Sequence, residues 1–104
     1  MTIKQIIGFN VLAKTLNFSK AAESTYMTQP AFSRMIQSLE EELGGQLFLR
    51  SKTAPKLSPL GEQVYPELLS IQRSYENIIE RVSGYKDINR KKYVEYSEKY
   101  FTFS

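Results

Sequence analysis

The sequence predicts a mainly α-helical fold, in which three short helices and a two-stranded ribbon precede one long helix. Apolar residues recur at the three- and four-residue spacing of a helix through most of the chain. Proline follows a hydroxyl-bearing cap where two of these stretches begin, at residues 28–30 and 58–59, and glycine ends one of them, at residues 44–45. Strand-like character is confined to residues 46–57. A chain of 104 residues is expected to form one domain with at most an appendage.

The composition argues against several classes of function. The chain has no cysteine and no histidine, which removes disulfides, thiolate metal sites and the commonest general base. The sequence contains no recognisable nucleophile–base pair, phosphate-binding loop or metal-ligand cluster, so we expect neither an enzyme nor a cofactor. It also lacks an apolar run of about 18 residues and the layout of a secretory signal. We therefore expect a cytoplasmic protein that does not bind membranes.

Basic residues gather in one part of the chain. The net charge of +3 is mild, but residues 1–56 carry seven basic and four acidic side chains. Between Leu43 and Gly61 there are three basic side chains and no acidic one. A local basic surface from Arg34 to Lys56 suits a polyanionic partner, although most such clusters are only solvated surface.

The first two helices are predicted from apolar spacing and capping. The first covers residues 3–16, begins after Thr2 and carries five regularly spaced apolar residues: Ile3, Ile6, Phe9, Leu12 and Leu16. Ser19 is the expected N-cap of the second helix. The paired small residues Ala21 and Ala22 allow another helix to approach closely.

The third helix is predicted over residues 28–43, with Thr28 as its cap. On a helical wheel at about 100° per residue, the core-facing sector holds Phe32, Ile36, Leu39 and Leu43. The opposite side holds Pro30, Arg34, Gln37 and Glu41, and Ser33 lies on the flank. The acidic residues of this helix all lie in its last turn, where their charge interacts unfavourably with the helix dipole. They are Glu40, Glu41 and Glu42.

This charge pattern makes sense if the first half of the third helix approaches an anion. Arginine can bind guanine, glutamine can bind adenine, and serine can bind bases or phosphate. Free N–H groups at the helix start also suit phosphate. A short helix, a tight turn and such a second helix form a helix-turn-helix. For Arg34 and Gln37 taken alone, an ordinary solvated face is the simpler reading; the caps, the ribbon and the long helix together favour DNA binding.

The ribbon is predicted as a strand at residues 46–50, a turn at 51–55 and a short return strand at 56–57. Its tip is basic and would act as a wing against the DNA backbone or the minor groove, through Arg50, Ser51, Lys52, Thr53 and Lys56. The first 57 residues are therefore interpreted as a winged helix-turn-helix domain.

The fourth helix is predicted over residues 58–84, with Ser58 as cap and Pro59 in its first position. Its apolar residues are spaced 4, 3, 4, 3, 4, which is the heptad spacing of a two-helix seam; they are Val64, Leu68, Ile71, Tyr75, Ile78 and Val82. We expect this helix to form a homodimer, and packing on its own domain is the alternative. Pro66 predicts a kink. Residues 85–104 are interpreted as a tail, either helical through Tyr93, Tyr96, Tyr100 and Phe103 or disordered.

Three stretches carry a more specific pattern: FSKAAE at residues 18–23, TQPAFSRMIQSLEEELGGQLFLR at 28–50 and LSPLGE at 57–62. In this order and with these gaps, the chain resembles the N-terminal domain of LysR-type transcriptional regulators over residues 3–83. The resemblance implies a winged helix-turn-helix followed by a linker helix that pairs with its twin. It also implies roles for individual residues. Major-groove contacts fall on Gln29, Pro30, Ser33 and Arg34, with Gln37 one turn further along. Ser19 and Thr28 match the residues at helix starts that lie near phosphates. The wing is matched by Arg50, Ser51, Lys52 and Thr53.

The resemblance implies a sequence-specific regulator that binds double-stranded promoter DNA as a homodimer. Typical members continue into a two-lobed effector-binding domain, for which the residues after Gly84 are too few, so no small-molecule effector is expected on this chain. Whether the chain is a fragment or a naturally short member is left open. The alternative function is an interaction protein that pairs through its linker helix with a full-length relative and modulates it. The two readings differ in whether the chain binds DNA strongly by itself.

Overall fold

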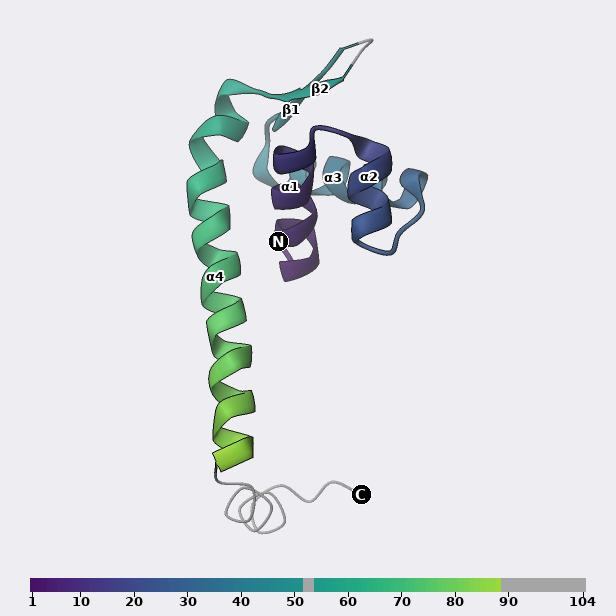
Figure 1. Ribbon diagram of the computed structural model, residues 1–104. Helices are drawn as coiled ribbons and strands as arrows, with labels where there is room; N and C mark the ends of the chain where they lie inside the picture. Colours follow the sequence, from purple (N-terminus) through teal and green to yellow (C-terminus); the bar gives the residue numbers. More distant parts are fainter. Residues whose placement is uncertain (52–53, 89–104) are drawn as a thin grey trace. The chain divides into compact units, whose positions relative to one another are not determined.

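The computed structural model describes residues 1–51 and 54–88, and the chain divides into two compact units, Met1–Arg73 and Ser74–Ser104. The predicted mainly helical class with a two-stranded wing is confirmed (Figure 1). The elements are α1 (Ile3–Thr15), α2 (Phe18–Ser24), α3 (Gln29–Leu43), β1 (Phe48–Arg50), β2 (Pro55–Leu57) and α4 (Pro59–Ile88).

The N-terminal ends of α1 and α2 are fixed by side-chain caps. Thr2 caps α1 as predicted, within a capping box that it forms with Gln5. The prediction of Ser19 as the cap of α2 was wrong. Asn17 is the cap, because its extended backbone precedes the first turn and its Oδ1 accepts a hydrogen bond of 2.9 Å from the Lys20 N–H. Ser19 therefore lies inside the first turn of α2.

Helix α3 begins and ends as predicted. The Thr28 hydroxyl accepts a hydrogen bond from the Ala31 N–H, and Gly44 ends the helix in a left-handed conformation with φ 78°. Phe32, Ile36 and Leu39 are fully buried, in agreement with the helical wheel. Their neighbour in that sector, Leu43, was predicted to be buried but is 42% exposed.

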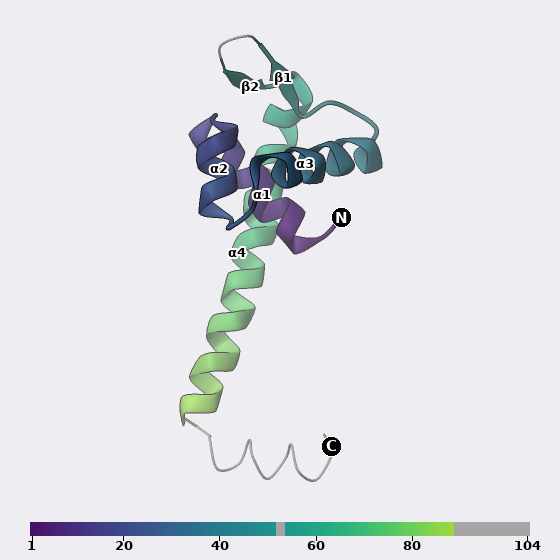
Figure 2. The same cartoon turned by 90° about the vertical axis from the view of Figure 1, so that its right-hand side faces the viewer.

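The core of the first unit lies between α1, α2, α3 and the start of β1. Helix α3 lies across α1 (Figure 2), with the Met35 and Phe32 side chains close to Gly8 of α1. Ala21 and Ala22 are buried where α2 packs, as the sequence predicted. Leu47 and Phe48, which follow α3 in the chain, are fully buried in this core, whereas Leu43 in the last turn of α3 is left at the surface.

The first half of α4 belongs to the same core. The Ser58 hydroxyl donates to the Gln46 carbonyl and accepts from the Gly61 N–H, which ties the start of α4 to the ribbon. Tyr65 packs edge-on against Phe9, with ring centroids 5.9 Å apart. Helix α4 continues without interruption through Pro66, and the kink expected there stays a prediction.

Two of the six residues predicted to form the pairing seam of α4 are instead covered by their own unit. Leu68 is 4% exposed and Val64 is partly buried, because both pack against the core of their own unit. The alternative reading, that α4 packs on its own domain, therefore holds for its first part. Four seam residues remain exposed: Ile71, Tyr75, Ile78 and Val82.

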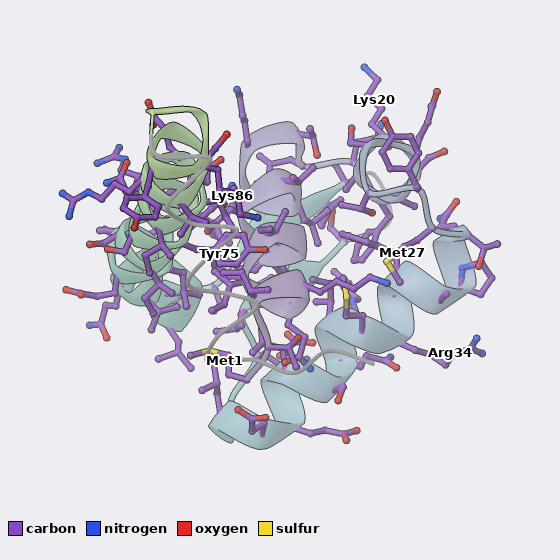
Figure 3. All side chains as sticks on the ribbon, turned by 90° about the horizontal axis from the view of Figure 1, so that it is seen from below. Met1, Lys20, Met27, Arg34, Tyr75 and Lys86 are labelled. Carbon is purple, nitrogen blue, oxygen red and sulfur yellow. The ribbon has the colours of Figure 1, made fainter. Side chains whose placement is uncertain are left out.

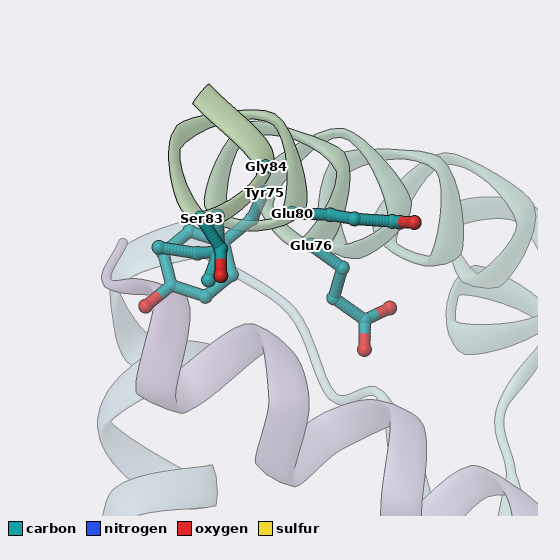
Figure 4. Close-up of a pocket in the computed structure, with 6 residues that line it drawn as sticks. Tyr75, Glu76, Glu80, Ser83 and Gly84 are labelled. Carbon is teal, nitrogen blue, oxygen red and sulfur yellow. The ribbon is translucent and has the colours of Figure 1, made fainter. Parts of the chain in front are cut away.

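The second unit contains the rest of α4, which extends to Ile88 and so passes the predicted end at Gly84. Residues on one face of this part of the helix line an open pocket of about 630 Å³ (Figure 4); they are Tyr75, Glu76, Ile79, Glu80, Ser83 and Gly84. The predicted apolar face of the tail, Tyr93, Tyr96, Tyr100 and Phe103, lies outside the described residues. Within the described ranges, no helix is long and apolar enough to cross a membrane.

Candidate nucleic-acid interface

The outer face of α3 is polar and has no internal role. Gln29, Pro30, Arg34 and Gln37 are exposed, and Ser33 is partly exposed. Arg34 extends away from the body of the first unit (Figure 3). Across residues 1–51 and 54–88, no hydrogen bond or ion pair engages the Arg34 guanidinium. These side chains are therefore available to a partner, as the sequence predicted.

The start of α3 adds backbone groups to this face. Thr28 is exposed and its hydroxyl is occupied by the Ala31 N–H, so its described role is that of a cap. Ser19 is also exposed, in the first turn of α2. Beside it, Lys20 projects into solvent (Figure 3) and was not among the predicted site residues.

The Arg50 side chain makes contacts within its own domain. Its guanidinium lies 3.5 Å from the Glu40 Oε1 and 5.4 Å from the centre of the Phe18 ring. The second Glu40 oxygen accepts hydrogen bonds from the backbone N–H groups of Leu47, at 2.8 Å, and Phe48, at 3.3 Å. Glu40 therefore fixes the entry into β1 and orients Arg50. The sequence indicated only that Glu40 lies in the last turn of α3. It did not predict that Glu40 would bind the backbone at the entry into β1 and the Arg50 side chain.

The ribbon carries the remaining predicted wing residues. Strands β1 and β2 are antiparallel, with Leu49 opposite Lys56, and the hairpin extends beyond the three short helices (Figure 1). Lys56 is exposed. The Ser51 hydroxyl donates to the Ala54 carbonyl and accepts from the Ala54 N–H, which closes one side of the turn. Lys52 and Thr53 lie outside the described residues.

A polar, partner-free helix face, a capped helix start and a basic wing thus come from one compact unit. Residues 3–62 match the family model described as bacterial regulatory helix-turn-helix protein, lysR family. The chain belongs to the LysR family. The match confirms the resemblance, and the family is one of bacterial regulatory helix-turn-helix proteins.

Relatives and solved structures agree with this assignment. The HTH-type transcriptional regulator IlvR of Caulobacter vibrioides is 45% identical over 69 residues, which cover 66% of this chain and 23% of IlvR. Vibrio fischeri DarR in complex with DNA matches with a TM-score of 0.77 and 35% identity, over 85% of this chain and 30% of that one. The complex of the BenM DNA-binding domain with catB site 1 DNA matches with a TM-score of 0.77 and 29% identity, over 82% of this chain and 94% of that one. The LysR-family chain thus spans about a quarter of the length of the curated relatives it matches.

Proposed function

We propose that this LysR-family chain binds promoter DNA sequence-specifically by placing α3 in the major groove, and that it does so as a homodimer paired through α4. The observation that carries the proposal is the outer face of α3, where Arg34 is exposed and has no ion-pair or hydrogen-bond partner in residues 1–51 and 54–88. Similarity to the DarR and BenM complexes with DNA supports the same mode of binding. Binding to the chromosome of a bacterium would place the chain in the cytoplasm.

Each exposed residue of the interface has a role in this proposal. Base edges are read by Gln29, Pro30, Ser33 and Arg34, and Gln37 reaches further along the groove. Ser19 and Thr28 lie near phosphates, where the backbone N–H groups at the helix starts add to the field. Wing contacts with the DNA backbone fall to Arg50, Ser51, Lys52, Thr53 and Lys56. Arg50 has to share its guanidinium with Glu40, so Lys56 is the stronger source of wing charge.

The exposed part of α4 supports pairing of two chains. Ile71, Tyr75, Ile78 and Val82 are between 40% and 59% exposed, and such a stripe on one helix is a typical association surface. Val64 and Leu68 are left out of this surface, because they belong to the core. Two recognition helices must lie about 34 Å apart, or a multiple of it, to enter successive major grooves. Once one half-site is bound, the second is met at high effective concentration.

A salt-titrated competition assay tests the proposal. Duplexes bound by the chain are selected from a randomised library, and the affinity for a selected duplex is compared with that for an unrelated duplex of the same length. We expect at least about 10³-fold preference for the selected duplex, and an affinity that falls as salt rises. A chain that pairs with a relative but binds no DNA alone would give no preference here, and the interaction-protein reading would replace the proposal.

A further inference from the structure

The turn between α2 and α3 presents one side chain almost completely to solvent. Tyr26 is 98% exposed, and its backbone is left-handed with φ 58°. Glycine is the usual residue at such a position, because a Cβ is disfavoured there. A large aromatic ring therefore occupies a position where it weakens the fold and buries almost no surface.

The turn does not need the tyrosine for its own geometry. The Tyr26 N–H donates to the Glu23 carbonyl at 3.1 Å and the Met27 N–H donates to the Ala22 carbonyl at 2.9 Å, which is the Schellman pattern of a helix end. Met27 is partly buried against the core and anchors the turn. In the described part of the chain, the Tyr26 ring and hydroxyl make no hydrogen bond and no ring contact. The backbone would form the same turn with glycine.

Tyr26 lies where the proposed DNA backbone would pass. It precedes the Thr28 cap of α3 by two residues, and it borders a shallow depression together with Lys20 of α2. In a helix-turn-helix, the first helix crosses the DNA backbone while the second enters the major groove. Glu23 lies on the same rim and disfavours an anion seated within the depression, so the phosphate would meet the exposed tip of the phenol. A tyrosine hydroxyl is a suitable donor to a phosphate oxygen.

We infer that the Tyr26 hydroxyl donates a hydrogen bond to a backbone phosphate beside the major groove that α3 enters, and that this contact compensates the strain of the turn. The inference rests on the proposed function and adds a residue to it. Phosphate contacts fix the position of a protein on the duplex without reading its sequence. Tyr26 should therefore raise the affinity for all DNA by the same factor.

Two substitutions separate the contact from the fold. Tyr26→Phe keeps the ring and removes the hydroxyl, and we expect it to weaken binding by about tenfold for the selected duplex and for an unrelated duplex alike. Tyr26→Gly relieves the left-handed strain, so we expect it to bind DNA as weakly as Tyr26→Phe, or more weakly, while its thermal unfolding midpoint stays equal or rises. Tyr85→Phe, an exposed tyrosine in the second unit, is the matched control and should bind like the unmodified chain.

The outcomes keep the inference and the proposed function apart. The inference would be wrong if both Tyr26 variants bound DNA as tightly as the unmodified chain. The proposed function would survive that result, provided that the unmodified chain still preferred its selected duplex. Loss of affinity for the selected duplex alone would also overturn it, because that result means a base contact. Failure of the unmodified chain to prefer any duplex would instead overturn the proposed function. A lower unfolding midpoint for Tyr26→Gly would contradict the strain on which the inference depends.

Discussion

At the scale of single residues, the charged side chains of α3 differ in whether they make contacts within the domain. Arg34 is free of internal partners in residues 1–51 and 54–88, whereas Glu40 binds two backbone N–H groups and Arg50 together. Glu41 is a neighbour of the same residue type and is exposed. The distinction follows from distances across the fold and not from residue type.

Glu40→Ala should destabilise the domain more than Glu41→Ala. Removing the Glu40 carboxylate leaves the Leu47 and Phe48 N–H groups without their acceptor, which costs about 1–3 kcal/mol. Surface changes such as Glu41→Ala usually stay within about 0.5 kcal/mol. Urea unfolding of both variants gives the comparison. Equal midpoints would mean that Glu40 does not hold the entry into β1.

At the scale of elements, the sequence predicted the helices, the ribbon and most of the core face of α3. Periodicity and the signals at helix ends are local, so they correctly predicted Thr28 as the N-cap of α3 and Gly44 as its C-cap. They could not predict the exposure of Leu43, because spacing within a helix does not show which other elements cover its last turn. They also set the start of α2 too late, because the predicted cap was Ser19 and the cap in the structure is Asn17, two residues earlier.

The candidate site could also be predicted only in part: exposure within one helix was predicted, but contacts between elements were not. The exposed polar face of α3 follows from the wheel, so the positions of Arg34 and Gln37 were predicted correctly. The contacts of Arg50 with Glu40 and Phe18 join three elements, and no spacing rule reports them. The same holds for Leu68, whose burial depends on the packing of α4 against α1 and not on its heptad position.

Two substitutions in α3 test its packing. Phe32→Ala should cost roughly 3–5 kcal/mol, because it opens a cavity in the core where the side chain is fully buried. Leu43→Ala should cost clearly less, because that side chain is 42% exposed. Thermal unfolding of the two variants is the measurement. A larger loss for Leu43→Ala would contradict the described end of α3.

At the scale of the whole molecule, the proposed function requires two surfaces. The first unit carries the polar face of α3 and the wing, and α4 carries the exposed apolar residues from Ile71 onward. The proposal needs both, because one recognition helix reads only a half-site. Substitutions in α4 should therefore abolish tight binding without unfolding the first unit.

The double variant Ile71→Lys with Ile78→Lys tests the pairing. Lysines on this face would place like charges opposite each other in a dimer, so we expect a monomer that keeps its helical content but loses most affinity for the selected duplex. Sedimentation at micromolar concentration and circular dichroism check the two parts. The corresponding control is Glu76→Lys with Arg73→Glu, which changes charges at exposed positions outside the proposed seam. A monomeric unmodified chain in the same sedimentation experiment would rule out pairing through α4.

The central claim, that α3 reads DNA sequence, is tested most directly by selecting duplexes from one randomised library with the unmodified chain and with Arg34→Ala in parallel. Lys56→Ala serves as the control, because loss of a phosphate contact should weaken binding to all duplexes and reduce the salt slope by about 1 for each chain of the dimer. For the unmodified chain we expect a site with two inverted half-sites. For Arg34→Ala we expect affinity lower by about 1–3 kcal/mol and relaxed preference at one symmetric pair of positions. An Arg34→Ala chain that selects the same site with the same stringency would contradict the assignment of α3 as the recognition helix.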